Sequence, residues 1–224
     1  MKTLNFLKKD GLALLFLSLP TALTLFFWNQ LPEQLTTHWN LAGNADDYQP
    51  KSVFLLTTLG TSLITYLILL VVPVIDPKPN AQRIRKPLRF IRLTVMAVLA
   101  IMMSSIVLKE VGYTIDMIFI GKVVSIFLFL VVGNLMAKFP PNYFAGIRTP
   151  WTLEYPEIWW QVHRFGAKLW VAGSLILLLF VFRLENFAYL ILFSAITLVL
   201  TLVPVIHSYV LYRKMYQPKS ADSD

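Results

Sequence analysis

Residues 53–75 read VFLLTTLGTSLITYLILLVVPVI and contain no charged side chain. A helix of about 20 apolar residues crosses the hydrocarbon layer of a bilayer, so this stretch predicts a membrane-spanning helix. The rest of the chain has the same character, since 57% of its 224 residues are hydrophobic and only 14% are charged. A soluble domain carries about 25% charged residues. The sequence therefore predicts an integral membrane protein.

Five further apolar stretches accompany this one. In chain order the six predicted spans are residues 11–28, 53–75, 93–108, 117–137, 169–182 and 187–212. The first is expected to be a retained helix rather than a signal peptide, because it is long and no small-residue cleavage site follows it. The fifth is the shortest and is expected to continue a helix that begins before it. The predicted fold class is an all-α membrane protein with a bundle of about six transmembrane helices.

Lysine and arginine are distributed unequally between the two sets of connecting segments. Sixteen of the 20 lie before the first span, in the second and fourth connections, or after the last span. Because basic residues are enriched in cytoplasmic loops, this predicts a cytoplasmic N-terminus and a cytoplasmic C-terminus. The net charge of +8 is spread between the spans rather than gathered in one patch, so direct binding to nucleic acid is not expected.

The predicted spans themselves carry little chemistry. Every acidic residue is expected to lie outside a span interior, which argues against proton-coupled pumps and intramembrane proteases. Arg92, at the edge of the third span, is expected to extend its charged end towards the interface. No Ser-His-Asp, Walker or dinucleotide-binding pattern occurs, so no enzyme activity, catalytic residue or cofactor is predicted.

The first long connection, residues 31–51, has a pattern of its own and is predicted to lie outside the cell. It reads LPEQLTTHWNLAGNADDYQPK, in which Thr36–Asn40 favours an extended run and Asn40–Gly43 a turn. One histidine beside two aspartates is a weak metal set, so no metal is expected. The segment is interpreted either as a polar cap with interfacial rings or as a surface for an extracellular ligand. The candidate residues are His38, Asn40, Gly43, Asp46, Tyr48 and Lys51.

The second patterned segment, residues 138–164, is predicted to be cytoplasmic. It reads KFPPNYFAGIRTPWTLEYPEIWWQVHR, and Pro156 followed by Glu157 favours the first turn of a helix. That helix is expected to lie at the interface, anchored by tryptophan and arginine, and to run into the fifth span. In the preceding stretch Arg148 offers a planar donor fork to a carboxylate, a phosphate or peptide carbonyls. The candidate residues are Asn142, Tyr143, Gly146, Arg148, Thr149, Pro150, Trp151, Thr152, Trp159 and His163.

These two segments resemble the motifs of the bacterial SdpI family. The first resembles the pattern H-x-N-x-x-G-x-x-D-x-Y-x-x-K of a domain of unknown function at the family's N-terminus, and NYFAGIRTPWTL at residues 142–153 resembles the family's signature. The resemblance implies a multi-pass protein of the bacterial plasma membrane. Residues 1–80 are then a two-helix unit carrying the outer loop, residues 81–216 a four-helix unit carrying the inner loop, and residues 217–224 a disordered tail.

The resemblance also implies a function. The family's founding member is an immunity protein against a secreted killing peptide, and is thought to hold a soluble transcriptional repressor at the membrane. The expected partners are therefore membrane lipid, a peptide toxin outside and a repressor protein inside. Two alternatives stay open: a small-solute transporter or channel, suggested by six spans and by His207, and an enzyme acting on lipid or peptidoglycan precursors.

Overall fold

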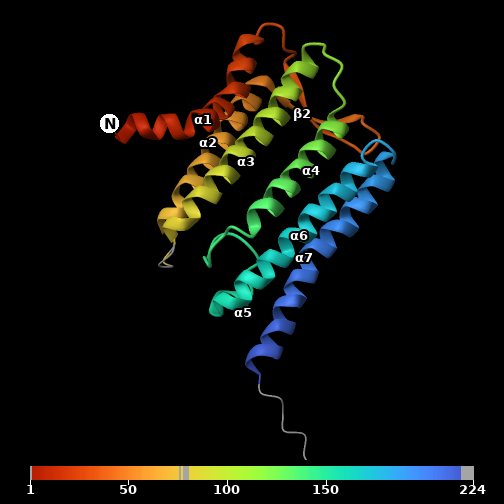
Figure 1. Cartoon of the computed structure of the whole chain (residues 1–224). Helices are drawn as coiled ribbons and strands as arrows, with labels where there is room; N and C mark the ends of the chain where they lie inside the picture. Colours follow the sequence, from red (N-terminus) through yellow and green to blue (C-terminus); the bar gives the residue numbers. More distant parts are fainter. Residues whose placement is uncertain (1, 76, 78–80, 218–224) are drawn as a thin grey trace, which may run out of the picture.

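The computed structural model describes residues 2–75, 77 and 81–217, and within these ranges the chain is a bundle of long helices with one small sheet (Figure 1). Apart from Gln217, the predicted disordered tail lies outside the described residues. The elements are α1 (Lys2–Phe26), β1 (Gln34–Trp39), β2 (Ala45–Pro50), α2 (Lys51–Ile75), α3 (Ala81–Glu110), α4 (Met117–Met136), α5 (Pro150–Glu154), α6 (Pro156–Phe180) and α7 (Asn186–Tyr216).

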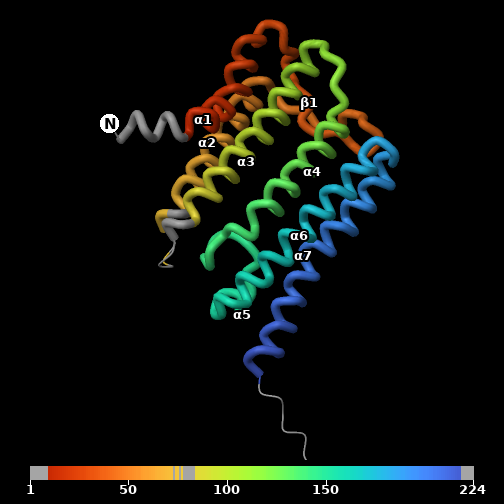
Figure 2. Tube along the Cα trace, in the orientation of Figure 1, coloured from red at the N-terminus to blue at the C-terminus, as the bar shows by residue number. Residues whose placement is uncertain are grey.

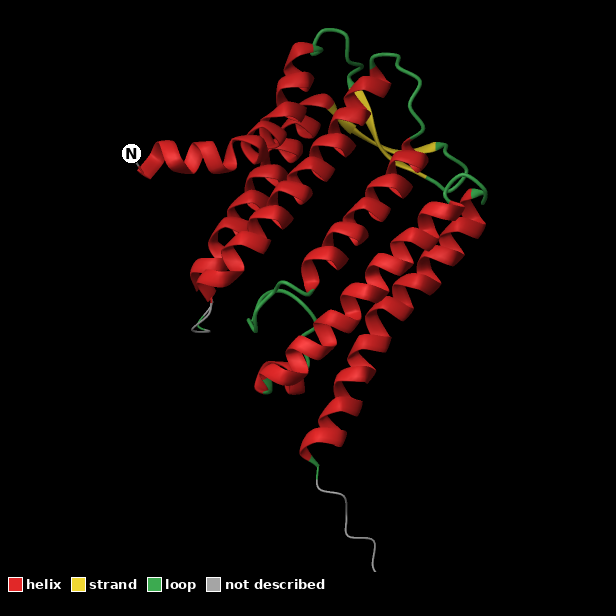
Figure 3. Cartoon of the chain, viewed as in Figure 1, coloured by secondary structure: helices red, strands yellow, loops and turns green. Residues whose placement is uncertain are grey.

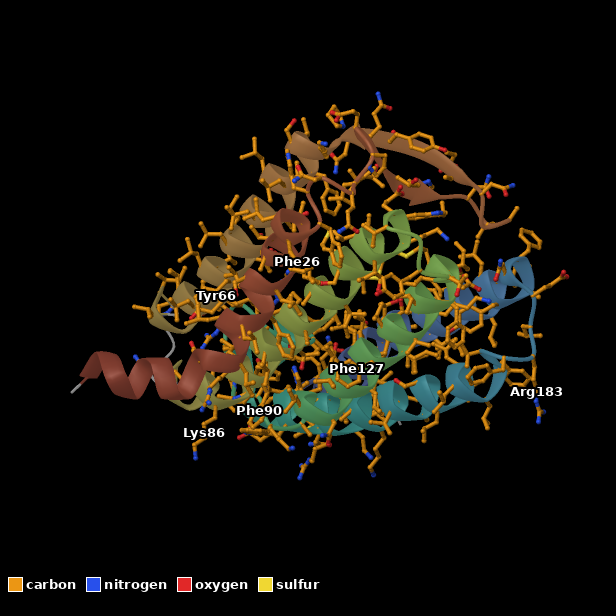
Figure 4. All side chains as sticks on the ribbon, turned by 90° about the horizontal axis from the view of Figure 1, so that it is seen from above. Phe26, Tyr66, Lys86, Phe90, Phe127 and Arg183 are labelled. Atoms are coloured by element: carbon orange, nitrogen blue, oxygen red, sulfur yellow. The ribbon has the colours of Figure 1, made fainter. Side chains whose placement is uncertain are left out.

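The described residues include five helices long and apolar enough to cross a membrane, in α2, α3, α4, α6 and α7. A sixth, shorter apolar helix, Asp10–Phe26, belongs to α1. The predicted all-α membrane bundle is thus confirmed, with the sheet as a small addition. Large apolar side chains such as Phe26 and Phe90 are exposed on the outside of the bundle (Figure 4), as expected for a surface that is surrounded by lipid.

The two patterned segments lie at opposite ends of the bundle (Figure 3). The strands β1 and β2 form an antiparallel hairpin at one end, together with the α3–α4 and α6–α7 connections. The α4–α5 connection lies at the other end, as the trace in Figure 2 shows. We call these the hairpin end and the motif end, and we call residues 138–155 the motif loop.

The helices pack in two groups of three that meet along α3 and α4. Helices α1 and α2 pack against α3, whereas α4 and α7 pack against α6. A core cluster at the hairpin end contains Leu35, Phe54 and Val107, and a second cluster at the motif end contains Leu88 and Trp159. The predicted division at residue 80 stays a prediction, although α3, which follows it, lies against the two helices that precede it.

The structure changes the expected interfacial helix. The first turns after Pro156 belong to α6, which continues without a break to Phe180, so the fifth span does extend a preceding helix. Of the tryptophans in this segment, Trp159 cannot act as an interfacial anchor, because its side chain is 0% exposed and packs in the core at the motif end. Tryptophan at that depth is held by a hydrogen bond and by packing rather than by lipid headgroups.

Candidate functional site

The tip of the hairpin is built by Asn40 and Gly43. The Asn40 side-chain oxygen accepts hydrogen bonds from the backbone N–H groups of Ala42 (3.0 Å) and Asn44 (3.1 Å). Gly43 has φ of +82°, a backbone conformation that costs glycine little because it lacks a Cβ. The extended run and the turn expected from sequence are therefore confirmed, and both residues act by shaping the hairpin.

The hairpin is held firmly on the bundle. Leu35 is fully buried in the core at the hairpin end, and the Thr36 backbone N–H donates to the Glu110 carboxylate at the end of α3 (3.1 Å). At the tip, the Asn186 side-chain amide donates to the Leu41 carbonyl (2.8 Å), which links the hairpin to the start of α7. The hairpin thus spans both helix groups and presents one fixed surface.

The exposed face of the hairpin carries the remaining candidates. His38 Nδ1 lies 2.6 Å from Asp46 Oδ1, and the two side chains are 66% and 42% exposed. Tyr48 is also exposed. In the described part of the chain no group of three or more His, Cys, Asp or Glu residues has the geometry of a metal site. His38, Asp46 and Tyr48 therefore form a polar, accessible patch suited to contact with another molecule.

Lys51 lies apart from this patch and has a different role. Its ammonium is 2.9 Å from the Glu33 carboxylate and 5.1 Å from the centre of the Trp28 ring. The side chain is 15% exposed. Lys51 therefore fastens the base of the hairpin to the end of α1 by an ion pair and a cation–π contact.

Asn142 organises the motif loop from the inside. Its side-chain oxygen accepts from the backbone N–H groups of Phe144 (2.9 Å) and Ala145 (2.7 Å). Its amide donates to the carbonyls of Pro140 and Ala145, each at 2.9 Å. The side chain is fully buried and uses its donors and acceptors on the loop backbone, so it fixes the loop's path.

His163 of α6 holds the next part of the loop. Its Nδ1 lies 2.8 Å from the Trp159 carbonyl, which can only accept, so Nδ1 carries the proton and Nε2 accepts from the Ile147 backbone N–H at 3.0 Å. The loop reaches this ring at Gly146, whose φ is +110°. A Cβ at Gly146 would lie 2.2 Å from His163 Nε2. The loop and α6 therefore meet at a contact that requires glycine.

The indole of Trp159 completes this buried scaffold. Its ring stacks on His163 with centroids 3.9 Å apart, and its Nε1 donates to the Phe139 carbonyl (2.8 Å). Trp159 and His163 are each 0% exposed. Trp159 and His163, four residues apart on one face of α6, thus receive the motif loop.

Thr149 and Thr152 form a capping box at the start of α5. The Thr149 hydroxyl accepts from the Thr152 backbone N–H (3.2 Å), and the Thr152 hydroxyl accepts from the Thr149 backbone N–H (2.8 Å), with Pro150 in the first turn. The Thr149 hydroxyl also lies 3.1 Å from the Ser208 hydroxyl of α7. Both threonines are buried, so this end of the loop is tied to α7 by polar contacts.

Aromatic rings of the motif loop stack along α7. Trp151 lies 5.1 Å from the ring centroid of Tyr209 and 5.8 Å from that of Tyr212, and Tyr155 stacks on Tyr216 at 3.9 Å. Desolvation, followed by the nearby Glu154 carboxylate, raises the pKa of the Tyr155 phenol above its ordinary value. Tyr209, Tyr212 and Tyr216 were not singled out from sequence, although their spacing of three and four residues places them on one helix face.

Arg148 and Tyr143 are both exposed in the motif loop. Arg148 Nη1 donates to the Tyr143 carbonyl (2.6 Å), which curves the loop around the guanidinium. Arg148, Gly146 and Ile147 also line a cavity of about 420 Å³ between α4, α6 and α7. The rest of the guanidinium fork is positioned to meet an anionic or carbonyl group that approaches the motif end.

Sequence reasoning missed a buried ion pair at the motif end. Arg92 Nη2 lies 2.7 and 2.6 Å from the two Asp10 carboxylate oxygens, and the Tyr66 hydroxyl donates to the same carboxylate (3.1 Å). Figure 4 labels Tyr66 where α2 lies beside α1. Asp10 is 3% and Arg92 6% exposed, so the expectation that Arg92 reaches the interface is wrong. The sequence did contain a signal for this pair. Asp10 directly precedes the first predicted span and Arg92 the third, so opposite charges are expected at the same end of the bundle.

The same cluster revises the view that acidic side chains avoid the bundle. Asp10 opens the apolar stretch of α1, and its carboxylate is enclosed by the first three helices. A charge in this environment is stable only when it is paired and hydrogen-bonded. The Arg92 guanidinium additionally donates to the Leu69 carbonyl (3.3 Å), so the cluster joins α1, α2 and α3.

The fold and these two ends define a multi-pass helical membrane protein with a structured segment at each end of its bundle. Residues 138–208 match the model of the SdpI/YfhL protein family, and residues 15–61 match a domain of unknown function, DUF1648. The chain is 30% identical over 216 residues to "Immunity protein SdpI" of Bacillus subtilis (strain 168), covering 93% of this chain and 98% of that protein. The chain belongs to the SdpI/YfhL family. No solved structure matches it.

Proposed function

We propose that this protein is a non-enzymatic membrane immunity protein that protects its cell from a secreted peptide toxin. The observation that carries the proposal is the 30% identity to an immunity protein along 93% of this chain. The geometry supports it, because the motif residues build two fixed surfaces at the ends of a bundle. In the motif loop and on α6, the Thr149 and Thr152 hydroxyls and both ring nitrogens of His163 are occupied by structural hydrogen bonds, which suits binding better than catalysis.

We propose further that the hairpin end faces the outside and the motif end the cytoplasm. The support is the distribution of basic residues, 16 of 20 of which lie before the first span, in the second and fourth connections, or after the last span. Because the chain has no cysteine, single reporters can be placed without background. Asn44→Cys at the hairpin tip should react with an impermeant maleimide on intact cells, and Glu154→Cys only after lysis. The reverse pattern would refute this orientation.

In this orientation His38, Asp46 and Tyr48 form the surface that meets the toxin. Their side chains are exposed on a hairpin whose backbone is anchored at both its base and its tip. A rigid polar patch with one aromatic ring can bind a peptide with little loss of conformational entropy. The toxin is therefore proposed to be intercepted where it reaches the outer face of the bilayer.

The motif end is proposed to receive a soluble repressor protein. Arg148, Arg213 and Lys214 are exposed there beside the stacked rings of Trp151 and Tyr212. Arginine and aromatic side chains are enriched at protein interfaces. An acidic surface on the partner would complement this end.

The proposal is tested by survival of toxin-sensitive cells that express the protein. Survival should rise with the intact protein and fall towards that of cells lacking it for His38→Ala, at unchanged protein level in the membrane. Asn44→Ala, a neighbouring change at the hairpin tip, is the matched control and should protect normally. For signalling, Arg148→Ala should reduce retention of the repressor at the membrane, whereas Thr201→Ala should not. Unchanged survival across a panel of peptide toxins would refute the immunity role.

A further inference from the structure

A large groove follows α6 on the side of the bundle between α4 and α7. Its volume is about 900 Å³, and small side chains leave it open, among them Ala137, Ala167 and Ala172. At Gly133, which also lines the groove, the helices α4 and α6 approach so closely that a Cβ would lie 2.7 Å from Trp170 Cβ. Because the three helices are membrane spans, the groove opens towards lipid.

The end of the groove nearest the motif loop is basic and polar. Arg164 and Lys168 are four residues apart on α6 and therefore share one helix face, and both are exposed. Asn134 and Gln161 belong to the same lining. Among the residues that line the groove none is acidic, and in the described part of the chain neither cation forms a salt bridge. Two positive charges thus stand at the rim without a counter-charge.

The remainder of the groove is apolar. Beyond Lys168 its lining on α6 continues with Val171, Ala172 and Leu175. From Gln161 to Leu175 the helix rises about 21 Å at 1.5 Å per residue, so the polar and apolar halves are each about 10 Å long. One leaflet of the hydrocarbon core is about 15 Å thick. The groove therefore matches a molecule with a charged head at the interface and an apolar chain in one leaflet.

We propose that this groove is a binding site for an anionic phospholipid. Arg164 and Lys168 contact the phosphate, the Asn134 and Gln161 amides bond the adjoining ester and headgroup oxygens, and one acyl chain lies along Leu175. Basic pockets between transmembrane helices bind anionic headgroups in this way. A zwitterionic lipid fits less well, because no carboxylate in the lining meets its ammonium group. The site is independent of the proposed immunity role.

Native mass spectrometry of the full-length protein in detergent tests the site. Phosphatidylglycerol should bind as one tight copy per chain, and phosphatidylcholine should bind more weakly. The double variant Arg164→Gln/Lys168→Gln should weaken the binding of phosphatidylglycerol about 30-fold, because it removes the attraction of two basic side chains for an anionic headgroup. The matched control Arg85→Gln/Lys86→Gln removes the same charge from exposed positions outside the groove, near the start of α3, and should bind normally.

A second variant tests the lipid site even if the double variant fails to fold. Ala172→Phe fills the apolar half without changing charge, at a side chain that is exposed in the groove, and should weaken binding of the acyl chain. Equal binding of the two lipids, or equal loss in both charge variants, would overturn the proposal. A dimer that buries Arg164 and persists when lipid is added would also overturn the proposal, because the groove would then be occupied by a second copy of the chain.

Discussion

Replacing Gly146 by alanine places a methyl group into the contact between the motif loop and α6. The added Cβ would lie 2.2 Å from His163 Nε2, the atom that accepts the Ile147 N–H bond. The backbone at this position has φ of +110°, which side-chain-bearing residues rarely adopt. The substitution therefore combines two separable penalties, backbone strain and the loss of a buried hydrogen bond.

The magnitude follows from these two penalties. A residue held in a sparsely populated backbone conformation costs about 1–3 kcal/mol. Displacing the imidazole leaves a buried polar group without its partner, which costs about 1–3 kcal/mol more. We therefore expect Gly146→Ala to lower the free energy of unfolding by about 2–6 kcal/mol.

Gly112→Ala is the matched control. Gly112 also has positive φ, +103°, but no atom lies within 4 Å of the Cβ that alanine would add. It should therefore show the strain alone, about 1–3 kcal/mol. The difference between the two variants isolates the contact with His163.

Reversible unfolding in mixed lipid–detergent micelles, followed by tryptophan fluorescence, measures these free energies. In a His163→Ala background the cost of Gly146→Ala should fall to that of Gly112→Ala, because the colliding ring is gone. The resulting interaction energy between the two sites should be about 0.5–3 kcal/mol. Additive effects, or equal costs for Gly146→Ala and Gly112→Ala in the intact protein, would refute the inferred contact.

Three further changes test the other parts of the structure by the same unfolding measurement. Asp10→Ala leaves the Arg92 guanidinium buried without its partner and should lower the free energy of unfolding by about 3–5 kcal/mol. Tyr66→Phe removes one hydrogen bond and should lower it by about 0.5–1.5 kcal/mol. Equal costs for the two variants would contradict the ion pair as the main contact. Leu35→Ala should cost about 2–5 kcal/mol and increase proteolysis of the hairpin, because it empties a fully buried position. Thr149→Val removes the helix cap and should cost about 0.5–2 kcal/mol while exposing the motif loop to hydrogen exchange; unchanged exchange there would count against the capping box.

The sequence by itself determined the membrane bundle and the places where function was to be sought. Apolar runs such as residues 53–75 are local features, and their length relates directly to the thickness of a bilayer. Turn-forming residues also act locally, which is why the Asn40–Gly43 turn and the helix start at Pro156 were predictable. The two loops themselves were recognisable from their motifs.

Roles within the motifs were less predictable, because they depend on burial. Sequence alone grouped Trp159, His163 and Arg148 as comparable candidates, but the structure buries the first two and exposes the third. Burial depends on what packs against a side chain, and the sequence does not show that the motif loop folds onto Trp159 and His163.

The tertiary structure alone decided the contacts between distant residues. Asp10 and Arg92 are separated by 82 positions, and Thr149 and Ser208 by 59, so each pair exists only because particular helices pack side by side. In a membrane, apolar lipid does not dictate which helices adjoin, and packing together with interhelical hydrogen bonds makes that choice. The groove beside α6 arises from the same packing, because it requires α4 and α7 to flank that helix.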